Sequence, residues 1–296
     1  MEKFKSENII EFTERFKTDA DCEQYLADIK WCEGFRCKRC GHCDYVKGRK
    51  ALDRRCQSCL FNESPTSQTI FHHIKFSLKK AFHICYRVSV SKKGMSSTEL
   101  SRELSLRQKT CWAFKRKIQE SMASSEVHPL IGNVDVDECA IGGLDEGEKG
   151  RSKGDKKLVS IAVEILKNGK IGRAYGVKIN NYSSKELSKI FEKHISKEAQ
   201  VRTDCWTGYI PIKEKRDIVQ EYSNKGKRFP EMHIVIMNLK SWLRGIYHKC
   251  SESHMQAYIN EFFYRFNRRS HTKTIFHNLL DRMLNLPPFP FKMFEN

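Results

Sequence analysis

The sequence predicts an α+β chain of several domains, in which a small metal-built module and a helical segment precede a mixed α/β core. Three observations support this fold class. Two C-x-x-C pairs lie within residues 1–70, helix-like spacing of apolar residues fills 71–130, and strand-like runs alternate with helical ones over 131–270. We therefore divide the chain at about residues 70, 130 and 270, and predict that 271–296 form a C-terminal tail.

The chain is strongly basic. Lys and Arg number 54 against 36 Asp and Glu, which gives a formal net charge of +18 and a sequence pI ≈ 9.4. Such a surface attracts polyanions, and double-stranded DNA is the partner we expect. A basic protein of the membrane surface is the alternative, but no basic anchor helix, signal peptide or apolar run of about 18 residues is visible. We expect a cytoplasmic protein with no membrane partner.

The cysteines indicate a zinc site. Eight of the 12 are scattered singly, which favours a reducing compartment over a disulfide framework. The other four form two C-x-x-C pairs, spaced so that two short turns can surround a tetrahedral Zn²⁺ in a zinc ribbon. Four ordinary reduced cysteines are the alternative, but so small and polar a segment lacks the core to fold without a metal. His42 and Cys43 remain competing ligands. The simplest ligand set is Cys37, Cys40, Cys56 and Cys59.

Helices are predicted on both sides of this ribbon. Residues 7–30 show helical periodicity, and Ser97 opens a later helix with capping chemistry. A break at Ser105 and Leu106 leads into a second, basic helix, which is the helix-turn-helix pattern, although the break has no glycine. A plain bundle of linker helices is the alternative. The basic residues expected to contact DNA here are Lys109, Lys115, Arg116 and Lys117.

Residues 134–143 read V-D-V-D-E-C-A-I-G-G. Valine and aspartate alternate at the period of a β-strand, so Asp135 and Asp137 share one face. Two carboxylates on one face repel each other, and a hard cation such as Mg²⁺ would explain their presence in a basic chain. An edge strand with a solvated face is the alternative.

The order of elements after this strand predicts how the acidic residues meet. A polar hairpin tip at 143–157 is followed by strands, a turn at Asn168 and Gly169, a helix from about 184 to 195, and a strand that ends at Asp204. Three strands, a helix and a fourth strand are the order of a ribonuclease-H-like sheet. The first and fourth strands are then neighbours, which would bring Asp137 and Asp204 to metal-bridging distance.

A third oxygen ligand is expected from a later helix. Asn238 lies in a helical run at 233–248, and an amide oxygen can bind Mg²⁺. Lys240 and Arg244 follow within two turns and could hold a phosphate. Taken alone, Asn238 is an ordinary helix residue.

A further helix at 254–269 carries an apolar and aromatic stripe, expected to be core. Glu261 and Arg265 would form a surface pair worth a few tenths of a kcal/mol. Arg265, Arg268 and Arg269 add basic surface that we expect to contact DNA. Residues 286–296 cannot form a regular element.

From residue 35 to residue 269 the chain resembles bacterial insertion-sequence transposases that carry an N-terminal zinc ribbon before a ribonuclease-H-like DDE domain. The motifs that carry the resemblance are C-K-R-C-G-H, R-C-Q-S-C, V-D-V-D-E-C-A-I-G-G, T-D-C-W-T-G-Y, H-I-V-I-M-N-L-K-S-W-L-R-G and E-F-F-Y-R-F-N-R-R. Their order, together with the charge and the cysteine usage, is specific to this family.

The resemblance implies a DDE-type transposase that cleaves and joins DNA at the ends of an insertion sequence with two Mg²⁺ or Mn²⁺ ions. Asp137 and Asp204 match the catalytic carboxylates, and Asp135 matches an accompanying acidic position. Asn238 and Lys240 fit a variant of the family in which Asn replaces the third Glu. The remaining candidates for the third ligand are Glu231, His233 and Glu261. Assembly as a homodimer or larger complex on DNA is a family expectation.

Two rival functions remain open. A non-catalytic DNA-binding regulator would use the zinc ribbon, the helix-turn-helix and the charge, but it leaves Asp135, Asp137 and Asp204 without a role, because carboxylates that face phosphates weaken binding unless a cation intervenes. A ribonuclease-H-like nuclease would use the same acidic site and cut without joining.

Overall fold

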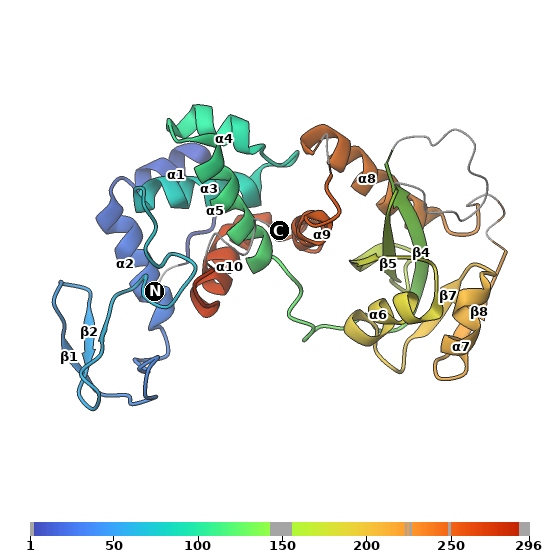
Figure 1. Cartoon of the computed structure of the whole chain (residues 1–296), viewed down its shortest axis with the longest axis horizontal. Coiled ribbons are helices and arrows are strands. Elements are labelled where there is room, and N and C mark those ends of the chain that lie inside the picture. The colour runs from blue at the N-terminus through green and yellow to red at the C-terminus, as the bar shows by residue number, and fades with distance from the viewer. Residues whose placement is uncertain (1–2, 143–155, 223, 225–226, 248–249, 290–296) are drawn as a thin grey trace. The chain divides into compact units, whose positions relative to one another are not determined.

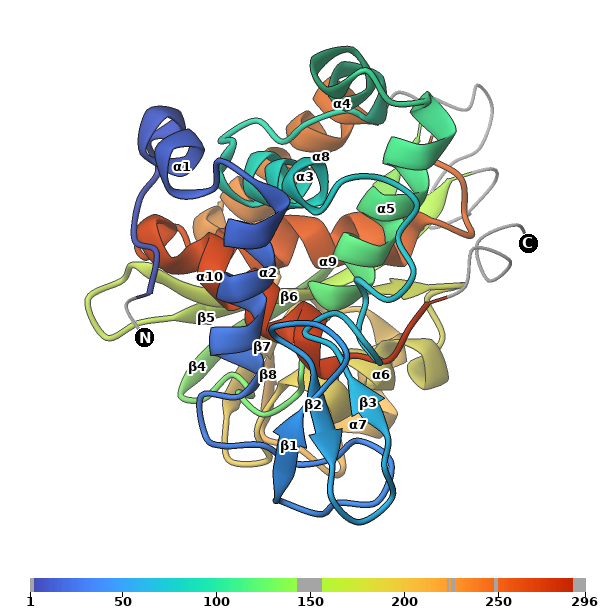
Figure 2. The ribbon, with the colours of Figure 1, turned by 90° about the vertical axis from the view of Figure 1, so that its left-hand side faces the viewer.

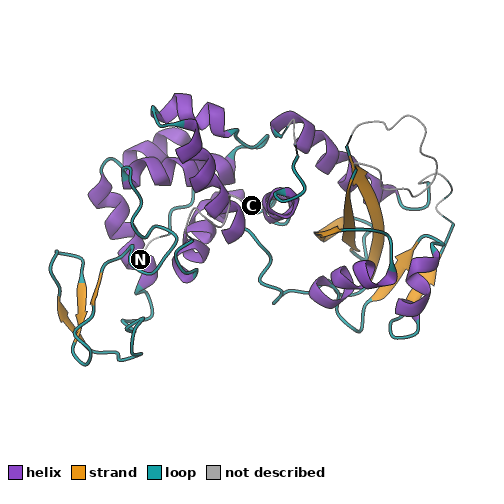
Figure 3. Cartoon of the chain, in the orientation of Figure 1, coloured by secondary structure: helices purple, strands orange, loops and turns teal. Residues whose placement is uncertain are grey.

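The computed structural model describes residues 3–142, 156–222, 224, 227–247 and 250–289. The chain forms two compact units, Met1–Met122 with Ser270–Asn296, and Ala123–Arg269. Helices and short strands build the first unit, whereas a five-stranded sheet with helices builds the second (Figures 1 and 3). The fold is therefore mixed α and β in several parts. No helix among the described residues is long and apolar enough to cross a membrane. Almost all of the predicted hairpin tip lies outside the described residues.

Two helices form where the N-terminal periodicity predicts helix. Thr18 accepts a hydrogen bond from the amide of Asp21, whose carboxylate accepts one from the amide of Thr18 in return. This capping box begins a second helix. The helical region predicted at 7–30 is therefore split into two helices, the first capped by Phe16 and the second by Thr18. The two helices are α1 (Ile9–Arg15) and α2 (Asp19–Lys30).

Aromatic side chains dominate the core of the first unit. Phe16 is fully buried, and its ring centroid lies 5.1 Å from Phe82 on α3 (Leu78–Val90) and 5.8 Å from Phe276 on α10 (Thr272–Asn285). The backbones of α2, α3 and α10 lie beside one another (Figure 2). Residues far apart in sequence therefore share one core.

Helix α10 corrects the prediction of a C-terminal tail for residues 272–285. Ile275, Leu279 and Met283 repeat every four positions and are buried, a period that is typical of an amphipathic helix. The hydroxyl of Tyr25 lies 2.8 Å from Nδ1 of His277, so a polar contact also joins α10 to α2.

The predicted helical pair is confirmed as α4 (Ser97–Leu104) and α5 (Gln108–Ser121). Ser105 takes the left-handed conformation, with φ 50°, and so turns the chain without a glycine. The N-cap is Ser96 and not Ser97, because the Ser96 hydroxyl accepts a hydrogen bond from the amide of Glu99.

The sheet of the second unit has the strand order β6-β5-β4-β7-β8. β4 pairs antiparallel with β5 and parallel with β7, so the predicted neighbours of the first strand are confirmed. A turn with Gly169 at φ 75° joins β5 to β6. The strands are β4 (Asn133–Ile141), β5 (Lys157–Ile165), β6 (Ile171–Ile179), β7 (Gln200–Thr203) and β8 (Ile218–Gln220).

Each face of this sheet has its own apolar core. Val134 and Val136 of β4 pack toward α6 (Ser184–His194), and Cys139 and Ile141 pack toward α8 and α9. Alternation along β4 therefore places Asp135 and Asp137 on the α8 face. The helices of that face are α8 (Pro230–Ile246) and α9 (Met255–Phe266). Between β7 and β8 lie a 3-10 turn (Thr207–Tyr209) and α7 (Ile210–Lys213).

Candidate zinc centre and candidate acidic site

Four thiols of the ribbon converge on one point. The sulfur atoms of Cys37 and Cys59 are 3.6 Å apart, those of Cys40 and Cys56 are 3.5 Å apart, and all four lie within 4.8 Å of one another. A tetrahedral Zn²⁺ with Zn–S bonds of about 2.3 Å needs sulfur atoms about 3.8 Å apart. The four cysteines therefore fit a zinc ion.

The two competing ligands lie outside this group. Cys43 is exposed and its thiol contacts the carbonyl of Gly41, while the His42 ring lies 3.3 Å from the carboxylate of Asp44. The predicted four-cysteine set is therefore the one that the structure gathers.

The backbone explains why the thiols converge. Each C-x-x-C pair ends in a turn closed by a left-handed residue. Gly41, with φ 77°, donates its amide to the carbonyl of Cys37, and Leu60, with φ 57°, donates its amide to the carbonyl of Cys56. Short strands then hold the two turns together. They are β1 (Tyr45–Lys47), β2 (Arg54–Cys56) and β3 (Asn62–Glu63).

A buried ion pair fastens the ribbon to α2. The ammonium of Lys30 lies 2.7 Å from the carboxylate of Glu63, and their side chains are 3% and 0% exposed. Lys30 also donates to the carbonyls of Ser64 and Ser67, at 2.9 and 2.8 Å. A Lys and a Glu 33 positions apart give no local pattern, so sequence reasoning missed this pair.

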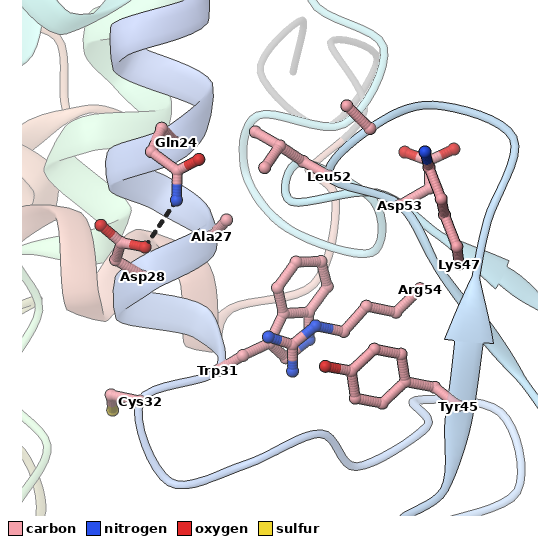
Figure 4. A pocket seen from close by; sticks show the side chains of 11 residues that line it. Gln24, Ala27, Asp28, Trp31, Cys32, Tyr45, Lys47, Leu52, Asp53 and Arg54 are labelled. Carbon is pink, nitrogen blue, oxygen red and sulfur yellow. Dashed lines mark hydrogen bonds between the residues drawn. The ribbon is translucent and has the colours of Figure 1, made fainter.

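A second contact lies at the wall of a pocket of about 540 Å³ between α2 and the β1–β2 hairpin (Figure 4). The guanidinium of Arg54 is 4.2 Å from the ring centroid of Trp31 and 4.4 Å from that of Tyr45. An arginine between two aromatic faces is stabilised by cation–π attraction. Arg54, one of the basic residues of the ribbon, is therefore engaged within the fold.

Asp135 is an internal ion-pair partner of Arg202. Its side chain is fully buried, and Nε and Nη2 of Arg202 donate to its two oxygens at 2.8 and 2.9 Å. Burial raises the pKa of Asp135, and the hydrogen bond and charge of Arg202 oppose that rise. The guanidinium also lies 5.2 Å from the ring centroid of Phe229, just before α8. This pair joins β4, β7 and the start of α8.

Asp137 and Asp204 follow directly on the last paired residues of two adjacent parallel strands. Val136 is in register with Thr203, where the β4–β7 ladder ends, so the next residue of each strand is an aspartate. Neighbouring strands are about 4.8 Å apart, which places the two half-buried carboxylates at the same level of the sheet. Asp137 accepts a hydrogen bond from the amide of Glu138 at 2.8 Å, and Asp204 one from the amide of Trp206 at 3.1 Å.

Within the described part of the chain, no third His, Cys, Asp or Glu completes a close cluster with Asp137 and Asp204. Among the described residues, the four cysteines are the one group of three or more such side chains within 4.8 Å.

Helix α8 presents Asn238 and Lys240 on different sides. Two positions on a helix correspond to a rotation of about 200°. Lys240 is half-buried and near β4, where its charge opposes the rise to about 12 that burial causes in the pKa of Cys139. Asn238 is exposed and lies seven positions, or about two turns, after Glu231, on the same side of the helix. Glu231 is close enough to Asp135 to raise its pKa.

Residues 129–267 match the model of the ISXO2-like transposase domain. This match supports an insertion-sequence transposase that acts on DNA. The matched segment lies within the second unit and contains β4, β7 and α8. The four-cysteine cluster outside it is compatible with a zinc ribbon. No curated protein matches the chain.

Two residues of α5 that were expected to contact DNA are instead buried. The ammonium of Lys115 donates to the carbonyl of Met95 at 2.5 Å, and Arg116 donates to Gln119 and Glu120. The prediction is corrected for both residues, because they lie with Phe114 and Ile118 on the side of α5 that is buried in the fold. The other two residues of α5 that were predicted to contact DNA remain accessible, because Lys109 is exposed and Lys117 is half-buried.

Glu261 and Arg265 are not the predicted surface pair. Glu261 is fully buried, its carboxylate accepts a hydrogen bond from the hydroxyl of Tyr247 at 2.5 Å, and Arg265 lies 4.0 Å away. Burial lowers the pKa of Arg265. This cluster holds α9 to the residue after α8, so Glu261 is engaged in packing within the second unit.

The remaining residues that were predicted to bind metal or DNA differ in how exposed their side chains are. His233 and Arg244 of α8 are exposed. Arg268 stacks on Tyr264, with 3.8 Å from guanidinium to ring centroid, and exposed Arg269 donates to the carbonyls of Ile171 and Gly172.

Sequence reasoning missed Tyr209, the last residue of T-D-C-W-T-G-Y. Its side chain is fully buried, and its hydroxyl donates to the carboxylate of Glu138, the residue after Asp137. A usable signal was present, because Glu138 falls in the apolar stripe of β4 with Val134 and Val136. A carboxylate at such a position requires a hydrogen-bond donor.

Proposed function

We propose that the protein is a DDE-type DNA transposase, which cleaves the ends of an insertion sequence and joins them to target DNA. The observation that carries this proposal is the placement of Asp137 and Asp204 directly beyond Val136 and Thr203 on adjacent parallel strands. Two carboxylates at one level of a sheet can bind divalent cations between them. Both lie inside the segment that matches a transposase domain.

A ribonuclease-H-like core is the fold that we propose for the second unit. Three antiparallel strands, with two short parallel strands added beside the first, support this assignment. Helices lie on both faces of the sheet, α6 on one and α8 with α9 on the other.

Asp137, Asp204 and Asn238 would together hold two Mg²⁺ or Mn²⁺ ions. Bound there, the ions would activate water or a DNA 3′-hydroxyl and stabilise the leaving oxygen. What supports Asn238 in this role is its place two turns after Glu231 on the same side of α8, because the charge of Glu231 acts on Asp135. Lys240, whose charge acts near Cys139 of β4, is proposed to bind the scissile phosphate.

The first unit would hold a structural Zn²⁺ through Cys37, Cys40, Cys56 and Cys59 and would bind double-stranded DNA. Helix α5 offers Lys109 and Lys117 along one side, eight positions apart. In the second unit Arg244 and Arg269 are exposed, and they are proposed to contact element ends or target DNA. A homodimer or larger assembly on paired ends belongs to this proposal.

The test is Mg²⁺-dependent cleavage and joining of DNA that carries the element's own ends, by wild type, Asp137→Asn and Asp204→Asn. We expect both variants to bind DNA and to lose cleavage. Asp217→Asn is the matched control, because Asp217 is an exposed aspartate of the same unit. Binding by all proteins without cleavage in Mg²⁺ or Mn²⁺ would favour a DNA-binding regulator, and cleavage without joined products would favour a nuclease.

A further inference from the structure

The backbone ladder does not extend to the two proposed metal-binding aspartates. β4 and β7 are paired from Asn133 with Gln200 as far as Val136 with Thr203. Asp137 continues in β4, which remains paired with β5 up to Ile141. Asp204 begins an irregular turn. The β4–β7 pairing ends one residue before the two aspartates, so side-chain contacts also contribute to the separation of their carboxylates.

The turn after Asp204 is held by its own contacts. The side-chain amide of Gln220 on β8 donates to the carbonyls of Asp204 and Trp206, at 3.2 and 3.0 Å. The indole of Trp206 donates to the carbonyl of Tyr182 at 2.9 Å. Gly208 has no room for a side chain, because a Cβ there would lie 2.7 Å from the Tyr182 carbonyl. The path of the chain to Tyr209 is thus restricted.

Tyr209 connects this turn to β4. Its ring is fully buried, with its centroid 6.2 Å from that of Phe191 on α6. Its hydroxyl donates to Glu138, one residue beyond Asp137 and on the opposite face of the strand. Burial raises the pKa of Tyr209 well above its usual range, and the charges of Glu138, Asp137 and Asp204 raise it further. One protonated hydroxyl therefore lies within electrostatic reach of all three carboxylates.

We infer that the Tyr209–Glu138 hydrogen bond is the link that sets the separation of Asp137 and Asp204, and that both residues are positioning residues for the divalent metal site. The inference rests on the proposed function. Glu138 itself faces away from the α8 side of the sheet, so it acts through the backbone of Asp137 and does not bind the metal. Loss of an outer-shell contact of this kind typically lowers metal affinity about 10- to 100-fold.

The experiment measures Mn²⁺ binding by calorimetry on the zinc-loaded full chain, with Asp137→Asn to identify the site, and then cleavage as a function of Mg²⁺ concentration. We expect Tyr209→Phe to weaken Mn²⁺ binding about tenfold and to raise the half-saturating Mg²⁺ concentration similarly, with cleavage restored at high Mg²⁺. Tyr175→Phe is the matched control, because its hydroxyl also makes one hydrogen bond in this unit, to the carbonyl of His128 at 3.0 Å.

Two variants of Glu138 separate position from charge. Glu138→Gln keeps an oxygen that can accept from Tyr209 but removes the charge, whereas Glu138→Ala removes both. If the link acts by position, Glu138→Ala should weaken Mn²⁺ binding as much as Tyr209→Phe does. Glu138→Gln should weaken it by less than about threefold. If glutamine and alanine are equally impaired, or if Tyr209→Phe binds Mn²⁺ as Tyr175→Phe does, the inference is wrong. Cleavage by wild type that is lost in Asp204→Asn would leave the proposed function intact in that case.

Discussion

Glu63→Gln tests how the ribbon is fastened to α2. The variant keeps the size of the side chain but removes the charge that balances Lys30 at 2.7 Å. Removing one partner of a buried ion pair typically costs about 3–5 kcal/mol. Because Lys30 keeps its hydrogen bonds to two backbone carbonyls, we expect the lower end, about 3 kcal/mol.

The loss of stability should shrink as pH rises. Burial lowers the pKa of Lys30, and the hydrogen bond and charge of Glu63 raise it. Without Glu63 the folded-state pKa falls further, whereas the unfolded value stays at about 10.4. Between these values the unfolded chain binds more protons than the folded chain, so stability rises with pH. The deficit of Glu63→Gln relative to wild type should therefore be smaller at about pH 9 than at about pH 7.

The assay is hydrogen–deuterium exchange in increasing urea, read by mass spectrometry, which follows α2 and the ribbon separately from the second unit. Glu33→Gln is the control, because Glu33 is exposed and its replacement should change stability by less than about 0.5 kcal/mol. A loss below about 1 kcal/mol for Glu63→Gln, or a loss independent of pH, would refute the reasoning.

Three further predictions concern the two metal sites and the stability of the second unit. Cys59→Ser should release Zn²⁺, measured by elemental analysis, and remove exchange protection from the ribbon while the second unit keeps its own; retained zinc would exclude Cys59 as a ligand. Asn238→Asp and Asn238→Glu should retain more strand transfer than Asn238→Ala, since each keeps an oxygen ligand; equal activity of all three would remove Asn238 from the metal shell. Burial lowers the pKa of His194 to about 4, below about 6.5 in the unfolded chain, so the second unit should lose up to roughly 3 kcal/mol as pH falls between these values. His194→Gln should flatten that dependence in urea denaturation, and an unchanged slope would contradict it.

Local patterns allowed much of the architecture to be predicted. The two C-x-x-C pairs specify their turns within a few residues, so the four-cysteine group was predictable from spacing. Alternation in residues 134–141 likewise placed valines on one face of a strand and aspartates on the other. The break at Ser105 was also visible, although its left-handed backbone was not.

Contacts between distant residues were not predictable in this way. The burial of Lys115 and Glu261 depends on which residues pack against their helices. The apolar pattern of a single helix does not reveal those packing partners. Arg202 and Asp135 are 67 positions apart, and they meet because β7 pairs in parallel with β4. A single sequence carries no record of such register.

The sequence by itself determined the chemistry available to this protein, namely four thiols, an acidic strand and a large excess of positive charge. Tertiary structure alone decided which of these groups act together. In the folded chain Asp137 and Asp204 lie at the same level of the sheet, Tyr209 donates a hydrogen bond to Glu138, and α10 packs in the core of the first unit. The physical reason is that local sequence fixes backbone conformation and periodicity, whereas strand register and burial depend on residues far away in the chain.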